Sequence, residues 1–137
     1  MPLCLLDTDM LSEILKQKNA VVVQKAALYL QTYQQFTFSA LTRYEVVRGL
    51  KAKAAARQLQ QFATFSKHCH ILPVTDAVFD RAADLWVSAQ AIGRPQKDAD
   101  LLIAATAMEH GLVLVSGNTS DFSWITAGLT LEDWRQP

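Results

Sequence analysis

Short, continuous apolar runs alternate along the chain with longer segments in which apolar residues recur every three or four positions. The continuous runs predict buried strands at residues 3–6, 36–39, 70–74 and 112–115, and a short edge strand at 129–131. The periodic segments predict helices between them. Strands that alternate with helices are typical of a parallel sheet covered on both faces. The pattern therefore predicts an α/β fold with a central, mostly parallel four- to five-stranded sheet flanked by helices.

Start and stop signals give the expected bounds of five helices. The first helix is expected from its cap at Thr8 or Asp9 to about Lys16, and the second over 23–33. The third is expected from Ser39 or Thr42 to about Lys67, and the fourth from Thr75 or Asp76 to Ile92. The fifth is expected from a cap at Asp98 or Asp100 to Met108. Gly49 is a candidate kink in the long third segment. Gly93 and Gly111 fit the left-handed position that ends a helix. The last segment is apolar almost all round, which predicts a central, buried helix.

The apolar spacing also predicts which face of each helix is buried. The expected stripes are Val23, Ala26, Ala27, Leu30 and Tyr33; then Tyr44, Val47, Leu50 and Ala54; then Val78, Ala82, Leu85, Ala89 and Ile92.

Length and charge narrow the function classes. The chain has 137 residues, of which half are apolar, so one domain spanning residues 1–137 is expected. Thirteen basic side chains balance 13 acidic ones, which argues against a binder that holds nucleic acid by overall positive charge. Cys4 and Cys69 lack metal-ligand spacing and indicate free thiols in a reducing compartment. Without a membrane-length apolar run or a signal-peptide pattern, a cytoplasmic protein without membrane contact is expected.

Polar oxygens gather where the predicted sheet would bind a ligand. In parallel α/β sheets, ligands bind beyond the carboxyl ends of the strands, and a helix that leads into a strand begins at that same edge. Four separate segments bring acidic or amide side chains there: Asp7 and Asp9, Glu45, Asp98 and Asp100, and Asn118 and Asp121.

A cluster of carboxylates has a physical cost that a cation relieves. Two carboxylates about 4 Å apart repel by roughly 4 kcal/mol at an effective dielectric near 20. Either one of them takes up a proton or the cluster binds a cation, and oxygen ligands favour Mg²⁺ or Mn²⁺ over zinc. Such an ion can activate water and neutralise a phosphate, so phosphodiester hydrolysis is the natural use.

Four segments carry a resemblance to a known family. They read LLDTDMLSEIL at 5–15, SALTRYEVVRGL at 39–50, DADLLIAATAMEHGLVLVSGNTSDF at 98–122 and LTLEDW at 129–134. With them the chain resembles the PIN-domain nucleases, in particular the VapC-type toxins of toxin–antitoxin modules. The resemblance implies a PIN-like fold and divalent-metal-dependent RNA cleavage, with tRNA as one substrate class. It also implies a small antitoxin as partner and a homodimer or larger toxin–antitoxin assembly.

The resemblance also assigns site residues. Asp7, Glu45 and Asp100 match the family's three acids, and are expected to be the catalytic residues and the ligands of Mg²⁺ or Mn²⁺. The fourth motif departs from the family's form, because Ser116-Gly117-Asn118 carries an uncharged amide and a glycine in place of a frequent basic residue. Asp121 could supply the missing charge, so a second metal position stays open.

Several residues keep two interpretations. Asp9 could cap a helix or bind the metal, and Asp98 could cap a helix or lie in the outer part of the site. Asn118 and Asp121 could belong to the site or simply form a turn. Four basic residues could guide RNA or belong to a solvated surface: Arg43, Arg48, Arg94 and Lys97.

Two other functions stay open. The start Leu5–Asp9 is also similar to the opening of haloacid-dehalogenase-type phosphatases, although no glycine follows Asp9 and Glu45 would have no role there. The second alternative is a non-catalytic module that binds a metal or a partner, which the uncharged Asn118 supports.

Overall fold

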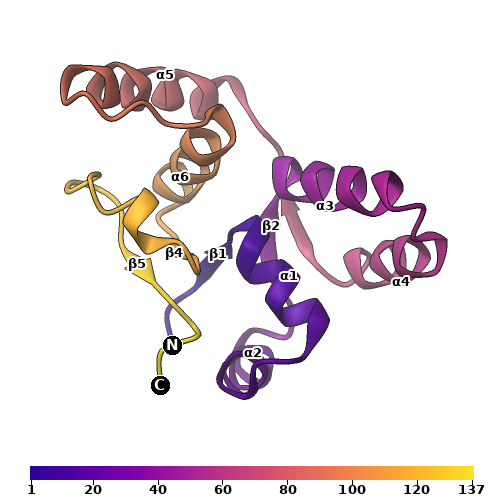
Figure 1. Cartoon of the computed structure of the whole chain (residues 1–137). Helices are drawn as coiled ribbons and strands as arrows, with labels where there is room; N and C mark the ends of the chain where they lie inside the picture. The colour runs from indigo at the N-terminus through magenta and orange to yellow at the C-terminus, as the bar shows by residue number, and fades with distance from the viewer.

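All five strands pair in parallel in one sheet. A computed structural model describes all 137 residues of the chain (Figure 1). The strands are β1 (Cys4–Leu6), β2 (Thr37–Ser39), β3 (His70–Leu72), β4 (Val113–Val115) and β5 (Leu131–Glu132). Their order across the sheet is β3-β2-β1-β4-β5. The predicted α/β architecture is confirmed, and the weak segment near residue 131 is the fifth strand.

Six α-helices and one 3₁₀ turn connect the strands. They are α1 (Thr8–Lys16), α2 (Ala20–Tyr33), α3 (Ala40–Ala52), α4 (Ala56–Ser66), α5 (Asp76–Ala91), α6 (Asp98–His110) and η1 (Thr119–Asp121). The single helix predicted from residue 39 to 67 is wrong, because the chain breaks between α3 and α4. The break lies at Ala54, whose φ is +53°, whereas Gly49 continues α3 without interruption. Two separate helices can each turn toward the core, which one straight helix of that length could not.

The two faces of the sheet carry separate cores. Leu6 and Phe38 point to the face covered by α1, α2, α3 and α4, and Leu5 and Leu114 point to the face covered by α5 and α6. Figure 1 shows these two groups of helices on opposite sides of the strands. The period of two along a strand explains the alternation. Both faces are therefore covered, which is why the central strands are continuous apolar runs.

Helix α2 buries only part of the predicted stripe, at Ala26 and, partly, at Tyr33. Its buried residues are Val22, Ala26 and Tyr29, while Val23 and Leu30 are each 38% exposed. The reason is tertiary: the Tyr29 hydroxyl accepts a hydrogen bond from the Cys4 backbone N–H at 3.2 Å. Because the helix is apolar on more than one side, its own spacing could not select the side that meets β1.

The predicted stripes of the other helices had mixed outcomes. In α3 the buried residues are Thr42 and Val46. The predicted stripe is confirmed in part, because Val47 and Leu50 pack partly buried against the core, whereas Tyr44 is 55% exposed and Ala54 is exposed. In α5 the prediction of a buried stripe is confirmed except at Ile92, which is exposed. Helix α6 is the central buried helix, as predicted; its buried residues are Leu101, Ile103, Ala104, Ala105, Thr106 and Ala107.

The predicted helix starts and ends had mixed outcomes. Asp7, rather than Thr8 or Asp9, caps α1. Neither Asp98 nor Asp100 caps α6, whose N-cap residue is Lys97 and has no capping side-chain hydrogen bond. Thr75 caps α5 as predicted, and Gly93 and Gly111 have the left-handed φ that ends a helix. None of the helices combines the length and the apolar character that crossing a membrane requires.

Candidate active site

The carboxyl edge of the sheet gathers the acids that the sequence placed there. Asp7 directly follows β1, and α3 and α6 both begin at this edge because they run antiparallel to their strands. The electrostatic environment of Asp100 includes the charges of Asp121, Glu45 and Asp9. That of Asp7 includes the charges of Asp9 and Asp100. Acids from four chain segments are therefore close enough to act on one another.

Asp7 is the most deeply buried of these acids, with 5% of its surface exposed. Its Oδ1 accepts the Met10 N–H at 2.8 Å, and its own N–H donates to the Val115 carbonyl at 3.0 Å. Burial raises its pKa from 3.8 to about 6, helped by the charges of Asp9 and Asp100, although hydrogen bonds from Ser116 and Met10 oppose the shift. The shift corresponds to roughly 3 kcal/mol against the charged form. A cation bound at this carboxylate would offset that cost.

Asp100 lies in the first turn of α6 and is half-buried. Burial raises the pKa of its carboxyl group, and the negative charges of Asp121 and Glu45 raise it further, while Lys97 lowers it. Asp100 and Asp7 thus experience the same two effects, desolvation and like charge. Both effects favour a bound cation over two free carboxylates.

Glu45 is held in place by neighbours on α1 and α3. Its Oε1 accepts the Thr8 hydroxyl at 2.6 Å, and Thr8 Oγ1 lies 3.2 Å from the Thr42 hydroxyl. Its other carboxylate oxygen lies 3.7 Å from Arg48 Nη2. Helix α3 therefore positions Glu45 through contacts with two other residues of the same edge.

The loop after β4 brings Asn118 and Asp121 to the acidic edge. Asn118 Nδ2 donates to Asp9 Oδ2, and the Asn118 N–H donates to the fully buried Ser116 Oγ at 2.9 Å. Asp121 lies exposed in η1. The amide of Asn118 thus ties one acid of the edge to the loop.

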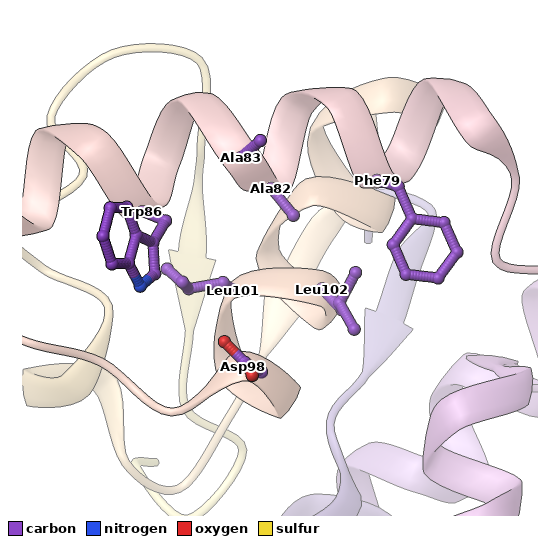
Figure 2. A pocket seen from close by; sticks show the side chains of 7 residues that line it. All are labelled: Phe79, Ala82, Ala83, Trp86, Asp98, Leu101 and Leu102. Atoms are coloured by element: carbon purple, nitrogen blue, oxygen red, sulfur yellow. The ribbon is translucent and has the colours of Figure 1, made fainter.

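Asp98 is exposed and lies beside a different feature of the surface. It lines a shallow pocket of about 300 Å³ between α5 and α6, and Figure 2 shows Asp98 at the start of α6 below this pocket. The other lining residues are apolar: Phe79, Ala82, Ala83, Trp86, Leu101 and Leu102. Asp98 therefore lies beside an apolar pocket, apart from the polar contacts of Asp7.

The four basic residues that could guide RNA differ in their contacts with the acidic edge. Arg48 pairs with Glu45 and stacks on Tyr44 at 5.1 Å from the ring centroid. Lys97 acts on the pKa of Asp100, and Arg94 donates to the Ser120 carbonyl at 3.3 Å. Arg43 is exposed on α3. Three of these four residues thus contact or act on the acidic edge or its loop.

Sequence reasoning missed an ion pair after β5. Arg135 Nη2 donates to the Gly117 carbonyl and also lies 3.2 Å from Asp133 Oδ2. Burial alone would raise the pKa of Asp133, but the hydrogen bonds from Arg135 lower it below its usual value. The available signal was positional, because residues that follow the weak strand at 131 reach the same edge as those that follow the other strands.

The donor set suits a hard cation, although the side chains do not converge on one point. No three acidic, histidine or cysteine side chains lie close enough together to hold an ion between them. Instead, Glu45 is bonded to Thr8, and Asp9 to Asn118. Carboxylate and amide oxygens are nonetheless the ligands that Mg²⁺ and Mn²⁺ prefer, and the raised pKa values of Asp7 and Asp100 mark the charge that an ion would neutralise.

Comparison with known proteins shows the family of the chain. The tRNA(fMet)-specific endonuclease VapC of Shigella flexneri is 28% identical over 131 residues, covering 95% of this chain and 96% of that protein. DNA-bound VapBC from Salmonella typhimurium superposes with a TM-score of 0.84 at 25% identity, covering 98% of this chain and 99% of that one. A toxin–antitoxin complex from Klebsiella pneumoniae gives 0.71 at 26%, with 93% and 95% covered. The model of the PIN domain matches residues 4–125, and the chain therefore belongs to the PIN domain family.

Proposed function

We propose that the chain is a divalent-metal-dependent endoribonuclease and the toxin of a toxin–antitoxin module. The observation that carries the proposal is Asp7, a buried carboxylate at the end of β1 whose pKa is raised to about 6 while the charge of Asp100 acts on it. A structural acid at a strand end has no need of a second acid beside it. A pair of acids that resist ionisation together is the arrangement that a cation stabilises.

Asp7 and Asp100 would hold Mg²⁺ or Mn²⁺, with Glu45 as the third ligand. The ion, when bound, lowers the pKa of a water molecule and neutralises charge on the scissile phosphate. Thr8 orients Glu45 by its 2.6 Å hydrogen bond, and Ser116 hydrogen-bonds to the Asp7 carboxylate. Such outer hydrogen bonds fix the direction in which ligand oxygens point.

The fourth motif supports a secondary role for the loop after β4. Asn118 and Asp121 would complete the outer part of the site, Asn118 through Asp9 and Asp121 through its charge on Asp100. Asp98 would lie outside this group, next to the α5–α6 pocket.

The relatives' names support the substrate class and the partners. One relative is called a tRNA(fMet)-specific endonuclease, which supports RNA, with tRNA as the first class to test. Two similar structures are named as VapBC bound to DNA and as a toxin–antitoxin complex, which supports a small antitoxin as partner. We further propose a cytoplasmic protein with one catalytic domain over residues 1–137, acting as a homodimer or in a larger toxin–antitoxin assembly.

The experiment is cleavage of a mixed small-RNA pool that contains tRNA. Purified wild type is compared with Asp7→Asn in Mg²⁺, in Mn²⁺ and in EDTA. Cleavage that requires both the metal and Asp7 supports the proposal. Cleavage that persists in EDTA or in Asp7→Asn overturns the metal site, and no cleavage in either metal overturns the nuclease.

A non-catalytic binding module is the second candidate, and one observation favours it. Asn118 carries no charge and engages Asp9, so the loop adds no carboxylate of its own at that position. Mn²⁺ binding without cleavage of any RNA would support this reading, with Asn118→Asp as the variant that should then restore activity. The phosphatase alternative has lost its support, because the chain belongs to the PIN domain family and Glu45 is bonded into the same edge as Asp7.

A further inference from the structure

The C-terminal tail brings a fixed guanidinium to the acidic edge. Strand β5 pairs with β4, with Glu132 opposite Val115, and the Ser116 N–H donates to the Glu132 carbonyl at 2.9 Å. Two residues further, Trp134 is buried with 1% of its surface exposed. This anchor fixes where the next residue, Arg135, leaves the core.

The guanidinium of Arg135 is held on one side only. Its Nε lies 3.3 Å from Asp133 Oδ1, and its Nη2 donates to Asp133 Oδ2 and to the Gly117 carbonyl. No hydrogen bond engages Nη1, and 42% of the side chain is exposed. The group is therefore oriented in advance, and the donors of Nη1 have no hydrogen-bond partner in the protein.

Gly117 is the residue that makes room for this guanidinium. A Cβ at position 117 would lie 3.0 Å from Arg135 Cζ and 3.3 Å from Nε and Nη1. The φ of Gly117 is not positive, so its backbone does not require glycine. Any other residue there would have to push the guanidinium away from the loop.

The guanidinium also lies within reach of the site's charges. The charges of Glu13 and Asp7 act on Arg135, besides that of its partner Asp133. A polyanion that approaches an edge with several carboxylates is repelled, and a cation fixed beside them lowers that repulsion locally. Arginine binds phosphate oxygens through charge-assisted hydrogen bonds.

We propose that Arg135 binds a backbone phosphate of the RNA next to the scissile bond, through its free Nη1 edge, while Asp133 and Gly117 hold it in place. The inference rests on the proposed nuclease function and deepens it. It makes the tail after β5 part of the RNA-binding surface.

The test measures RNA binding apart from catalysis. A labelled single-stranded RNA oligonucleotide is titrated in EDTA at several salt concentrations, with binding followed by fluorescence anisotropy. Each phosphate contact contributes about 0.7 to the slope of log affinity against log salt for single strands. Arg135→Gln should lower that slope by about 0.7 and weaken binding by about tenfold at low salt. The control Arg81→Gln, which removes an arginine paired with Glu109 between α5 and α6, should leave the slope unchanged.

Three further variants separate charge from structure. Arg135→Lys should keep the slope, because it keeps the charge. Gly117→Ala should weaken binding without changing the net charge, because its Cβ displaces the guanidinium. Asp133→Asn should keep the slope while loosening the tail, which a lower melting temperature would report.

The outcomes distinguish this inference from the proposed function. If wild type cleaves RNA with metal but Arg135→Gln and Arg81→Gln give equal slopes and affinities, only the role of Arg135 fails. If Arg135→Gln lowers the melting temperature but leaves RNA affinity and salt slope unchanged, Arg135 only stabilises the tail and the inference is overturned. If wild type neither cleaves nor binds RNA, the proposed function fails and Arg135 loses its ligand with it.

Discussion

The two ends of the acidic edge differ in how their polar groups are held. At one end Asp7 is buried, with its carboxylate bonded to the Met10 N–H and its pKa raised to about 6. At the other end Asp9 and Asp121 are exposed, and Asp9 is engaged by the Asn118 amide. The first end carries charge that water cannot screen, whereas the second carries charge that it can.

The difference shows where the chemistry belongs. A cation at the buried end offsets both the desolvation of Asp7 and its repulsion with Asp100. Binding a cation there therefore lowers the free energy of the site strongly. A cation at the exposed end exchanges the water molecules of its hydration shell for carboxylate oxygens that bind it about as well. We therefore expect the buried end to bind the metal and the exposed end to adjust it, and the following variants test that division from the largest effect to the smallest.

Replacing the buried acid should have the largest effect. Asp7→Asn should lower RNA cleavage by about a thousandfold, since metal-based charge stabilisation contributes several kcal/mol. Asparagine can still cap α1, so the variant should stay folded. The matched variant Asp9→Asn, at the exposed end, should lose less than about tenfold. Equal losses in the two variants, measured as initial rates, would contradict the comparison.

The buried end should also make the metal-free protein sensitive to pH. The pKa of Asp7 is about 6 in the folded chain, above its ordinary value of 3.8. The group therefore favours the folded state below about pH 4, and that contribution is lost as the pH rises through 6. In EDTA, wild type should lose up to roughly 3 kcal/mol of unfolding free energy between pH 4 and 7 relative to Asp7→Asn. Urea unfolding measures this, and Mg²⁺ at pH 7.5 should restore stability to wild type alone; parallel pH profiles would refute the assignment.

The Thr8 hydroxyl should have an intermediate effect. Thr8→Val removes the 2.6 Å hydrogen bond that orients Glu45, and loss of such an outer contact typically costs about 10- to 100-fold in metal affinity or activity. Thr8→Ser keeps the hydroxyl and should recover most of the rate. Mn²⁺ titration and cleavage kinetics check both variants. If Thr8→Ser were as defective as Thr8→Val, packing rather than the hydrogen bond would explain the loss.

The exposed loop should show the smallest effect. Asn118→Ala breaks the contact with Asp9 and should lower activity by less than about tenfold. Asn118→Asp adds a carboxylate beside Asp9 and should tighten Mn²⁺ binding, which isothermal titration can measure. Weaker Mn²⁺ binding by Asn118→Asp would show that the loop stays away from the metal.

The placement of the acids at one edge of the sheet was largely predictable because it follows from local rules. An apolar run that ends at Asp7 predicts a buried strand with an acid at its carboxyl end, and the parallel topology then places Glu45 and Asp100 at the same edge. The roles of Thr8, Ser116 and Arg135 were not predictable in this way. Each depends on a partner far along the chain, such as Glu45 for Thr8 or Gly117 for Arg135.

The sequence by itself determined the order of the five strands along the chain, the central position of α6, a cap at Thr75 or Asp76 and the helix ends at Gly93 and Gly111. These depend on the spacing and backbone preferences of neighbouring residues, which are present before any long-range contact forms. Only the tertiary structure decided which side of α2 is buried and where the chain breaks between α3 and α4. It also decided that Arg135 lies on Gly117, because these outcomes depend on surfaces that meet only when the sheet is assembled.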